Sequence, residues 1–239
     1  MLLTDYKWFE ARPHSESVGN PPLIVRRLGL QDYRPIFESM RYLAQHSGPE
    51  RQDEIWLLSH KPVYTQGQAG RPEHAVNPGN IPVVQVDRGG QITYHGPGQL
   101  VAYLLINVRR RKLGVRVLVD LVEQAVLATL SHFGITGTTN PKAPGVYVKD
   151  AKISALGLRI RNGWSYHGLS VNVNMDLSPF ANINPCGYPH LAVTQMADFI
   201  EPKAAELQSV GMVLTDQLLV ALGYLAHYDL MQQDAIGMS

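Results

Sequence analysis

Residues 145–174 read GVYVKDAKISALGLRIRNGWSYHGLSVNVN, and this stretch decides the fold class. It contains three runs rich in β-branched and aromatic residues, as strands are, at 145–148, 152–160 and 164–174. The dipeptides between them, Lys149-Asp150 and Asn162-Gly163, suit the two-residue turns of β-hairpins. We therefore expect three consecutive antiparallel strands here.

The flanking sequence adds strands and helices in no regular alternation. Short apolar runs predict strands at 23–28, 55–58, 83–86 and 100–108, with a long loop between the second and the third. Helical spacing predicts helices at 33–44, 118–133 and, as one or two helices, within 194–227. This order predicts an α+β fold, with a mixed or antiparallel sheet packed by helices on one side.

The expected domain organisation is simple. Residues 1–22 form a polar, turn-rich stretch that we expect to be a loose N-terminal extension. A single catalytic domain is expected over 23–227, followed by a C-terminal tail at 228–239.

Composition narrows the function classes. Hydrophobic residues make up 45% of the 239 residues and charged residues 17%, as in globular proteins. The net charge of +1 predicts no global attraction to nucleic acid or to a membrane. The single cysteine excludes an intramolecular disulfide, and it suits a reducing compartment. Without an evident signal peptide or a bilayer-length apolar run, a cytoplasmic location is expected.

The segment 88–100, RGGQITYHGPGQL, is the most unusual in the chain. Its glycines permit positive φ angles and a close approach of the backbone to a ligand, while Arg88, Tyr94 and His95 offer polar contacts. A hairpin that needs glycine only at its bends would have the same composition. A nucleotide-binding P-loop is excluded, because its Lys-Ser or Lys-Thr pair is absent.

Cys186 lies between Pro185 and Gly187, which favour a tight and reproducible turn. A lone cysteine is usually a buried, inert thiol, and a nucleophilic one needs a neighbour that favours the thiolate. The candidates are three histidines and one lysine, namely His95, His167, His190 and Lys152. Residue reasoning does not choose among them. No histidine spacing typical of a metal site occurs, so we expect no metal.

One basic cluster stands out, formed by Arg109, Arg110, Arg111, Lys112 and Arg116. Such a run is usually a solvated face. Its functional interpretation is a docking patch for an acidic protein.

Five separated motifs, taken together, resemble the lipoyl(octanoyl) transferase family. They are RGGQITYHGPGQL at 88–100, Lys152-Ile153 with LGLR at 156–159, HGL at 167–169, NVN at 172–174 and NPCG at 184–187. They occur in the family's order over about 23–200. The resemblance implies a fold shared with lipoate and biotin protein ligases, and transfer of an octanoyl group from acyl carrier protein to a lysine of a lipoyl domain. The implied acceptors are the lipoyl domains of 2-oxoacid dehydrogenases and glycine cleavage proteins, and no cofactor is implied.

The resemblance also assigns roles to individual residues. The family's nucleophilic cysteine falls on Cys186 and its catalytic lysine on Lys152. Its substrate contacts fall on three short segments, which comprise Arg88, Gly89, Gly90, Gln91, Ile92, Thr93, Tyr94 and His95, then Ala155, Leu156 and Gly157, and then Gly168, Leu169 and Ser170.

The implied pair of Cys186 and Lys152 is chemically sensible. A cysteine exchanges an acyl group with a thioester donor at nearly constant bond energy, so the acyl-enzyme stays activated until an amine attacks it. Lys152 would favour the thiolate as a cation and would accept a proton as a neutral amine, which requires a pKa well below about 10.4.

Three alternatives stay open. An ATP-dependent lipoate ligase would share the fold but would need a nucleotide. A Cys-His hydrolase using His95 or His167 would release a free acid. A binding module for acyl or lipoyl groups would leave Cys186 unreactive.

Overall fold

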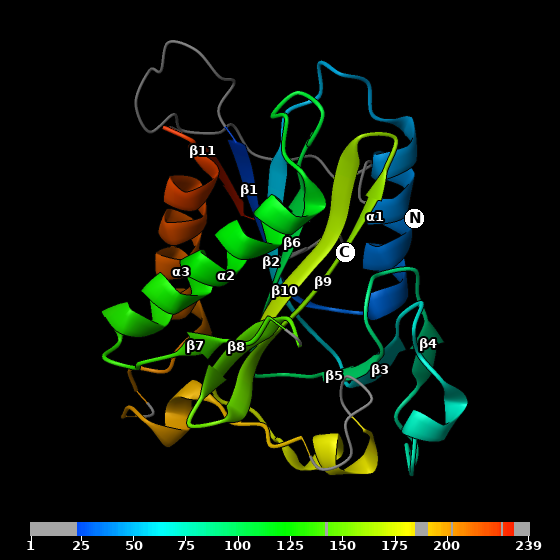
Figure 1. Ribbon diagram of the computed structural model, residues 1–239, viewed down its shortest axis with the longest axis vertical. Coiled ribbons are helices and arrows are strands. Elements are labelled where there is room, and N and C mark those ends of the chain that lie inside the picture. The colour runs from blue at the N-terminus through cyan, green and yellow to red at the C-terminus, as the bar shows by residue number, and fades with distance from the viewer. Residues whose placement is uncertain (1–22, 142, 185–190, 202, 226, 232–239) are drawn as a thin grey trace, which may run out of the picture.

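The computed structural model describes residues 23–141, 143–184, 191–201, 203–225 and 227–231. In this part of the chain, eight strands form a mixed sheet in the order β11-β1-β2-β6-β10-β9-β8-β7 (Figure 1). The strands of this sheet are β1 Leu23–Gln31, β2 Glu54–His60, β6 Gln99–Leu105, β7 Thr138–Thr139, β8 Gly145–Val148, β9 Ala151–Arg161, β10 Trp164–Asn172 and β11 His227–Met231. The pairs β1/β11 and β1/β2 are parallel, and the remaining neighbours are antiparallel.

The three strands predicted at 145–174 form the consecutive antiparallel strands β8, β9 and β10. Their turns lie where the sequence predicts them. Lys149 and Asp150 have φ angles of 48° and 68°, and Asn162 and Gly163 have 51° and 85°, which is the geometry of a hairpin turn with two left-handed residues. The expected α+β class with a mixed sheet is confirmed.

The helices cover both faces of the sheet, which corrects the expectation that they lie on one side. The helices are α1 Tyr33–His46, α2 Val115–His132 and α3 Leu207–Leu222. α1 packs in one buried cluster with Trp56 and Tyr166, whereas α2 and α3 pack in another with Leu57 and Leu169 (Figure 1). Because Trp56 and Leu57 are neighbours in β2, their side chains point to opposite faces of the sheet. The two clusters therefore lie on opposite faces.

The region expected to be a long loop also holds ordered elements. β3 Val63–Gln66 pairs in parallel with β4 Val83–Gln85 and in antiparallel with β5 Ile92–His95. A short 3₁₀ helix, η2 Pro72–His74, lies between β3 and β4, and two others, η3 Ser178–Asn182 and η5 Met196–Asp198, follow β10. β3 escapes prediction because its apolar run is only Val63 and Tyr64, followed by the polar Thr65 and Gln66.

The C-terminal boundary differs from the expectation as well. β11 pairs with β1 from Leu23 opposite His227 to Arg27 opposite Met231, so residues 228–231 belong to the sheet rather than to a tail. The extension at 1–22 and residues 232–239 lie outside the described residues.

Within the described ranges, no helix combines the length and the apolar character that crossing a membrane requires. Nor do three or more His, Asp or Glu side chains of that part of the chain gather as metal ligands do.

Candidate active site

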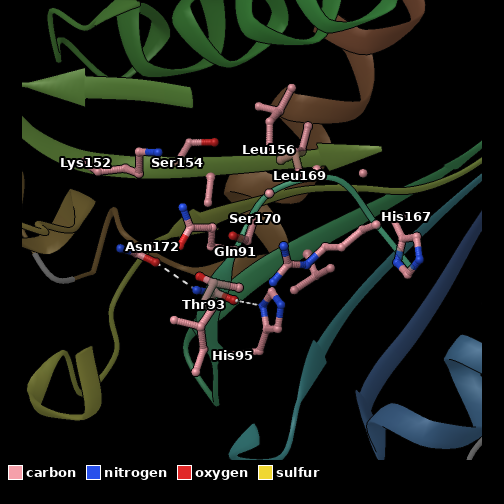
Figure 2. A pocket seen from close by; sticks show the side chains of 18 of the residues that line it. Gln91, Thr93, His95, Lys152, Ser154, Leu156, His167, Leu169, Ser170 and Asn172 are labelled. Atoms are coloured by element: carbon pink, nitrogen blue, oxygen red, sulfur yellow. Dashed lines mark hydrogen bonds between the residues drawn. The ribbon is translucent and has the colours of Figure 1, made fainter. Parts of the chain in front are cut away.

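A cavity lies on the α1 face of the sheet, between strands β6, β10 and β9 and the glycine-rich segment 88–93. Of the substrate contacts that the family resemblance implies, all except Gly89 and Tyr94 line this cavity. Figure 2 shows side chains from the segment 91–95 and from β9 and β10 around it. Three segments far apart in sequence therefore form one site.

The two exceptions have structural positions. Gly89 is paired with β9, because its backbone N–H donates to the Leu158 carbonyl oxygen at 3.2 Å. Tyr94 is buried in a separate cluster, with its ring centroid 5.5 Å from those of Tyr64 and Phe180.

Two glycines let the backbones approach around the cavity. A Cβ on Gly168 would lie 2.0 Å from the Ala102 carbonyl oxygen, and a Cβ on Gly157 would lie 3.0 Å from the Gly89 carbonyl oxygen. Any side chain at Gly168 would force β10 away from β6. The close spacing of β6 and β10 thus requires glycine at Gly168, and the segment above β9 leaves little room for a side chain at Gly157.

Lys152 lines one end of the cavity and is only 4% exposed. Its Nζ donates to the Pro144 carbonyl oxygen at 3.0 Å and lies 5.1 Å from the centre of the Tyr147 ring. Its backbone is also engaged, since Lys152 N–H donates to the Ala192 oxygen at 2.8 Å and its oxygen accepts from Thr194 N–H at 3.0 Å.

Cys186 and His190 lie outside the described residues. The chain on either side of 185–190 has defined partners. Asn184 N–H donates to the His74 oxygen at 2.9 Å, and Val193 forms a parallel bridge with Lys152 and lines the cavity.

His95 belongs to a continuous chain of hydrogen bonds under the cavity. Its Nδ1 lies 2.7 Å from Gln99 Oε1, which can only accept, so Nδ1 carries the proton. Its Nε2 lies 3.3 Å from the Thr65 hydroxyl. Gln99 in turn donates to Asn172, whose amide donates to the Thr194 oxygen. Burial and the neighbouring His60 lower the pKa of His95 to about 3, so it is neutral with both nitrogens engaged.

Arg88 supports the same chain. Its Nη2 donates to the Thr65 carbonyl oxygen at 2.6 Å and to the Thr65 hydroxyl at 2.9 Å, while Nη1 donates to the Gly89 oxygen. The guanidinium therefore holds the glycine-rich segment against β3.

His167 lies toward the other end of the cavity from Lys152 (Figure 2). Its cross-strand partner is Leu158, six residues from Lys152 along β9, which corresponds to roughly 20 Å of strand. Its φ of 59° is uncommon for a residue other than glycine within a strand. This conformation brings His167 Nε2 to 2.9 Å from one oxygen of Asp87, while Tyr166 donates to the other oxygen.

The Asp87 carboxylate is the common hydrogen-bond acceptor of His167 and Tyr166. Burial raises the pKa of Asp87, but the hydrogen bonds from His167 and Tyr166 outweigh it and bring the pKa down to about 2. Burial lowers the pKa of His167, with Asp87 opposing that effect. Asp87 accepts and His167 is neutral, so Nε2 carries the proton and Nδ1, which has no partner, is an acceptor.

Several lining residues escaped sequence reasoning, namely Tyr33, Gln99, Val101, Tyr103, Ser154, Asn172, Phe180 and Val193. Gln99 and Asn172 fall within the quoted family motifs, and their place in these motifs could have identified them as site residues. The aromatic and aliphatic ones have the spacing of ordinary core residues, so only their contacts distinguish them.

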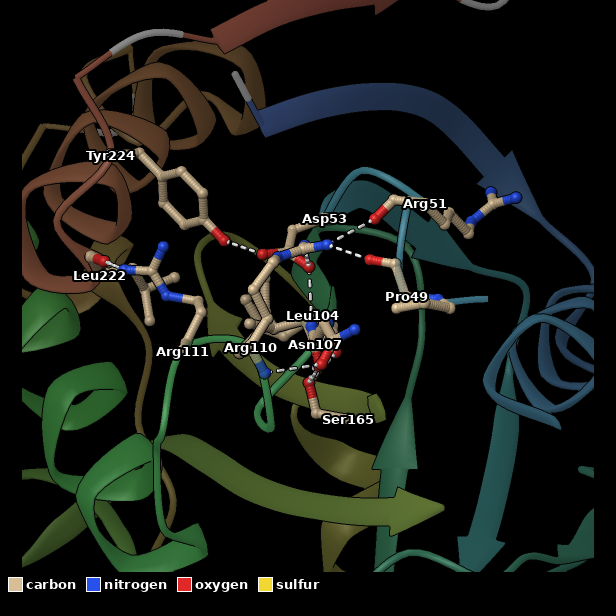
Figure 3. A network of polar contacts seen from close by, with 11 residues as sticks. Pro49, Arg51, Asp53, Leu104, Asn107, Arg110, Arg111, Ser165, Leu222 and Tyr224 are labelled. Atoms are coloured by element: carbon tan, nitrogen blue, oxygen red, sulfur yellow. Dashed lines mark hydrogen bonds and ion pairs between the residues drawn. The ribbon is translucent and has the colours of Figure 1, made fainter. Parts of the chain in front are cut away.

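The basic cluster is divided by the structure. Arg110 Nη2 pairs with Asp53 at 2.5 Å, and its Nη1 donates to the Pro49 and Arg51 oxygens (Figure 3). Arg111 donates to the Leu222 oxygen and stacks on Tyr224 at 4.2 Å. These two arginines serve the fold, which corrects their expected place in a docking patch. The exposed members are Arg109, Lys112 and Arg116.

Comparisons with known proteins show the family of this chain. The model of the lipoyl protein ligase A/B catalytic domain matches residues 32–218. An octanoyltransferase of Pseudomonas entomophila is 58% identical over 200 residues, covering 84% of this chain and 92% of the relative. An octanoyltransferase of Vibrio cholerae is 54% identical over 202 residues, with the same coverage of 84% and 92%.

A solved structure is also similar. A lipoate-protein ligase A bound with ATP superimposes with a TM-score of 0.68 at 14% identity, over 92% of this chain and 90% of that one. At this identity the likeness concerns the fold alone, and the expected ligase-like fold is confirmed.

Proposed function

The chain belongs to the lipoyl protein ligase A/B catalytic domain family, and we propose that it carries an octanoyl group through Cys186 to a lysine of lipoyl domains. It is an acyltransferase that acts in lipoate biosynthesis, as its octanoyltransferase relatives indicate. The observation that carries the proposed mechanism is the cavity itself, because it gathers Lys152 and the expected substrate contacts in one place.

In the first half-reaction, the Cys186 thiolate attacks the thioester carbonyl of octanoyl-acyl carrier protein. A new C–S bond forms on Cys186, the C–S bond to the carrier breaks, and the carrier leaves as a thiolate. No redox agent or cofactor is consumed.

In the second half-reaction, the amine of the acceptor lysine attacks the acyl-enzyme. The C–N bond of an amide forms, the Cys186 thiolate leaves, and the proton released by the amine goes to Lys152 or, through it, to the thiolate. The position of Lys152 supports this role, since its main chain pairs with residues 192–194, a few residues beyond Cys186.

The partners are part of the proposal. We take the donor to be octanoyl-acyl carrier protein and the acceptors to be lipoyl domains of 2-oxoacid dehydrogenases and glycine cleavage proteins. A free thiol is best preserved in the reducing cytoplasm, and we place the reaction there.

One feature weighs against a Cys-His hydrolase that uses His95, because both ring nitrogens of His95 are engaged in hydrogen bonds. An ATP-dependent ligase is supported by the fold and by the family model, and activity without ATP separates the two enzymes.

The test is intact-mass analysis after incubation with octanoyl-acyl carrier protein. We expect a single octanoyl adduct that is absent in Cys186→Ala and that disappears when a lipoyl domain is added, with the octanoyl mass passing to that domain. An adduct that persists in Cys186→Ala, or release of free octanoate in place of the amide, would contradict the proposal.

A further inference from the structure

The cavity is a slot with regularly spaced rows of residues. Along β6 and β10, Asn172 is opposite Gln99, Ser170 is opposite Val101, and Gly168 is opposite Tyr103. Because alternate residues of a strand share a face, all three rows face the cavity, and all six residues line it. The rows are two residues apart, so the first and third are separated by about 13 Å.

The two ends of the slot differ. Lys152, Phe180 and Val193 lie beyond the Asn172 row, and this is the end where the proposed chemistry takes place. At the opposite end the lining is Tyr103 together with Tyr33, from the first turn of α1. Both tyrosines belong to the buried cluster between α1 and the sheet, with 5% and 4% exposure, so this end is blind.

The blind end is held firmly in place. The Tyr103 hydroxyl lies 2.7 Å from His60 Nε2, and the Tyr33 ring packs 4.9 Å from the His60 ring and 6.1 Å from the His95 ring. Phe37 and Trp56 fill the space in the cluster around it. A side chain fixed on several sides cannot move to admit a longer ligand without disturbing the core.

The side chains that form the blind end are themselves neutral. Burial raises the pKa of Tyr33 and of Tyr103 above the ordinary value for tyrosine and lowers the pKa of His60 to about 4. The nearby charged groups are held by hydrogen bonds, Arg88 by Thr65 and the Gly89 oxygen and Asp87 by Tyr166 and His167. An alkyl tail at this end therefore packs against the neutral rings of Tyr33 and Tyr103.

We propose that Tyr33 and Tyr103 form the end wall of the slot and set the longest acyl chain that the enzyme accepts. The inference rests on the proposed function, because it places the acyl carbonyl at the Lys152 end and the methyl end against the tyrosines. Val101, in the middle row, lies beside the path of the chain between the two ends.

The test compares acylation of Cys186 by N-acetylcysteamine thioesters of six, eight, ten and twelve carbons, with initial rates followed by intact mass. Tyr33→Val shortens the wall, and the ratio of the ten-carbon to the eight-carbon rate should rise about tenfold or more. Val101→Phe fills the middle row, and the ratio of the eight-carbon to the six-carbon rate should fall by about tenfold.

Two controls accompany these variants. Tyr33→Phe keeps the ring and removes only the hydroxyl, so the chain-length profile should not change. Leu43→Ala removes a buried side chain from the same helix, ten residues on, and Leu43 does not line the slot. It should lower stability as Tyr33→Val does and leave the profile of the wild type.

The outcomes are distinct. If wild-type enzyme forms no eight-carbon adduct, the proposed function fails. If it does, but folded Tyr33→Val and Val101→Phe both keep the wild-type profile, the end-wall inference fails alone. The same holds if Leu43→Ala shifts the profile as much as Tyr33→Val. Should Tyr33→Val not fold, Val101→Phe decides the question.

Discussion

Two buried polar regions of this molecule differ in how completely their atoms are paired. Around Asp53, one carboxylate oxygen accepts from Asn107 N–H at 2.7 Å and from Arg110 at 2.5 Å, and the other accepts from Tyr224 (Figure 3). In the cavity, Ser154 Oγ, Gln91 Oε1 and His167 Nδ1 have no hydrogen-bond partner among the described residues.

The difference separates a structural network from a site. The Asp53 carboxylate joins the start of β2, the chain after β6 and the chain after α3, so the full pairing of its two oxygens holds distant segments together. A buried polar atom without a partner costs about 1–3 kcal/mol. One such atom, Arg111 Nε, lies beside this network, whereas three line the cavity, which agrees with a surface shaped for a substrate rather than for stability.

The largest effect is expected from Lys152→Met, which keeps most of the side-chain volume and removes the amine. Transfer of octanoyl to a lipoyl domain should slow by about 10²–10⁴-fold, the usual contribution of a proton-transfer group. The midpoint of thermal unfolding should change little. Full activity in this variant would remove Lys152 from the mechanism.

Asp53→Ala tests the Asp53 network and should lower stability while leaving activity unchanged. It leaves Arg110 and the Tyr224 hydroxyl without their acceptor, so the free energy of unfolding should fall by about 3 kcal/mol, measured by denaturant titration. Activity per folded molecule should stay at the wild-type level.

The exposed pair of Lys61 and Asp32 supplies the control for Asp53→Ala. Their side chains are 59% and 64% exposed, so Lys61→Met should cost less than about 1 kcal/mol. Equal losses for both variants would mean that the Asp53 network is not special.

Asp87→Asn, at the border of the cavity, should lower the free energy of unfolding by a smaller amount that depends on pH. The folded-state pKa of Asp87, about 2, is below the unfolded value of about 4, so its carboxylate stabilises the fold above pH 4 and loses this contribution as the pH falls toward 2. The stability difference between wild type and variant, from denaturant midpoints, should be largest above pH 4 and narrow below it. A difference that is constant with pH would contradict this account of Asp87.

The smallest effect is expected on the surface. The double variant Arg109→Glu with Lys112→Glu should raise KM for octanoyl-acyl carrier protein by about threefold at low salt, and added salt should remove the difference. The octanoyl thioester of N-acetylcysteamine is the control, and its KM should not change. Equal loss with both donors would exclude a docking role for these side chains.

Local patterns in the sequence were sufficient for much of the fold. The hairpins of β8, β9 and β10 follow from runs rich in β-branched and aromatic residues and from turn dipeptides that tolerate positive φ angles. The helices α1 and α2 follow from apolar residues at helical spacing. Such signals are local, because neighbouring residues are enough to produce them.

Identifying the site required both the sequence motifs and the tertiary structure. The collinear motifs indicated Lys152 and nearly all of the glycine-rich and small residues that line the cavity. They did not indicate Tyr33 or Tyr103, since a tyrosine that closes a slot has the same sequence spacing as one in the core. Cys186 stays a prediction, because it lies outside the described residues.

The amino-acid order alone established the class of fold and the hairpins, because each depends on a short motif or on a local pattern, and its family motifs indicated most of the residues that line the cavity. Only the tertiary structure decided which face of the sheet each helix covers and that Arg110 and Arg111 turn inward to Asp53 and Leu222. It also decided where the slot ends. These features depend on contacts between segments far apart in sequence, and burial and pairing across such distances leave no local pattern.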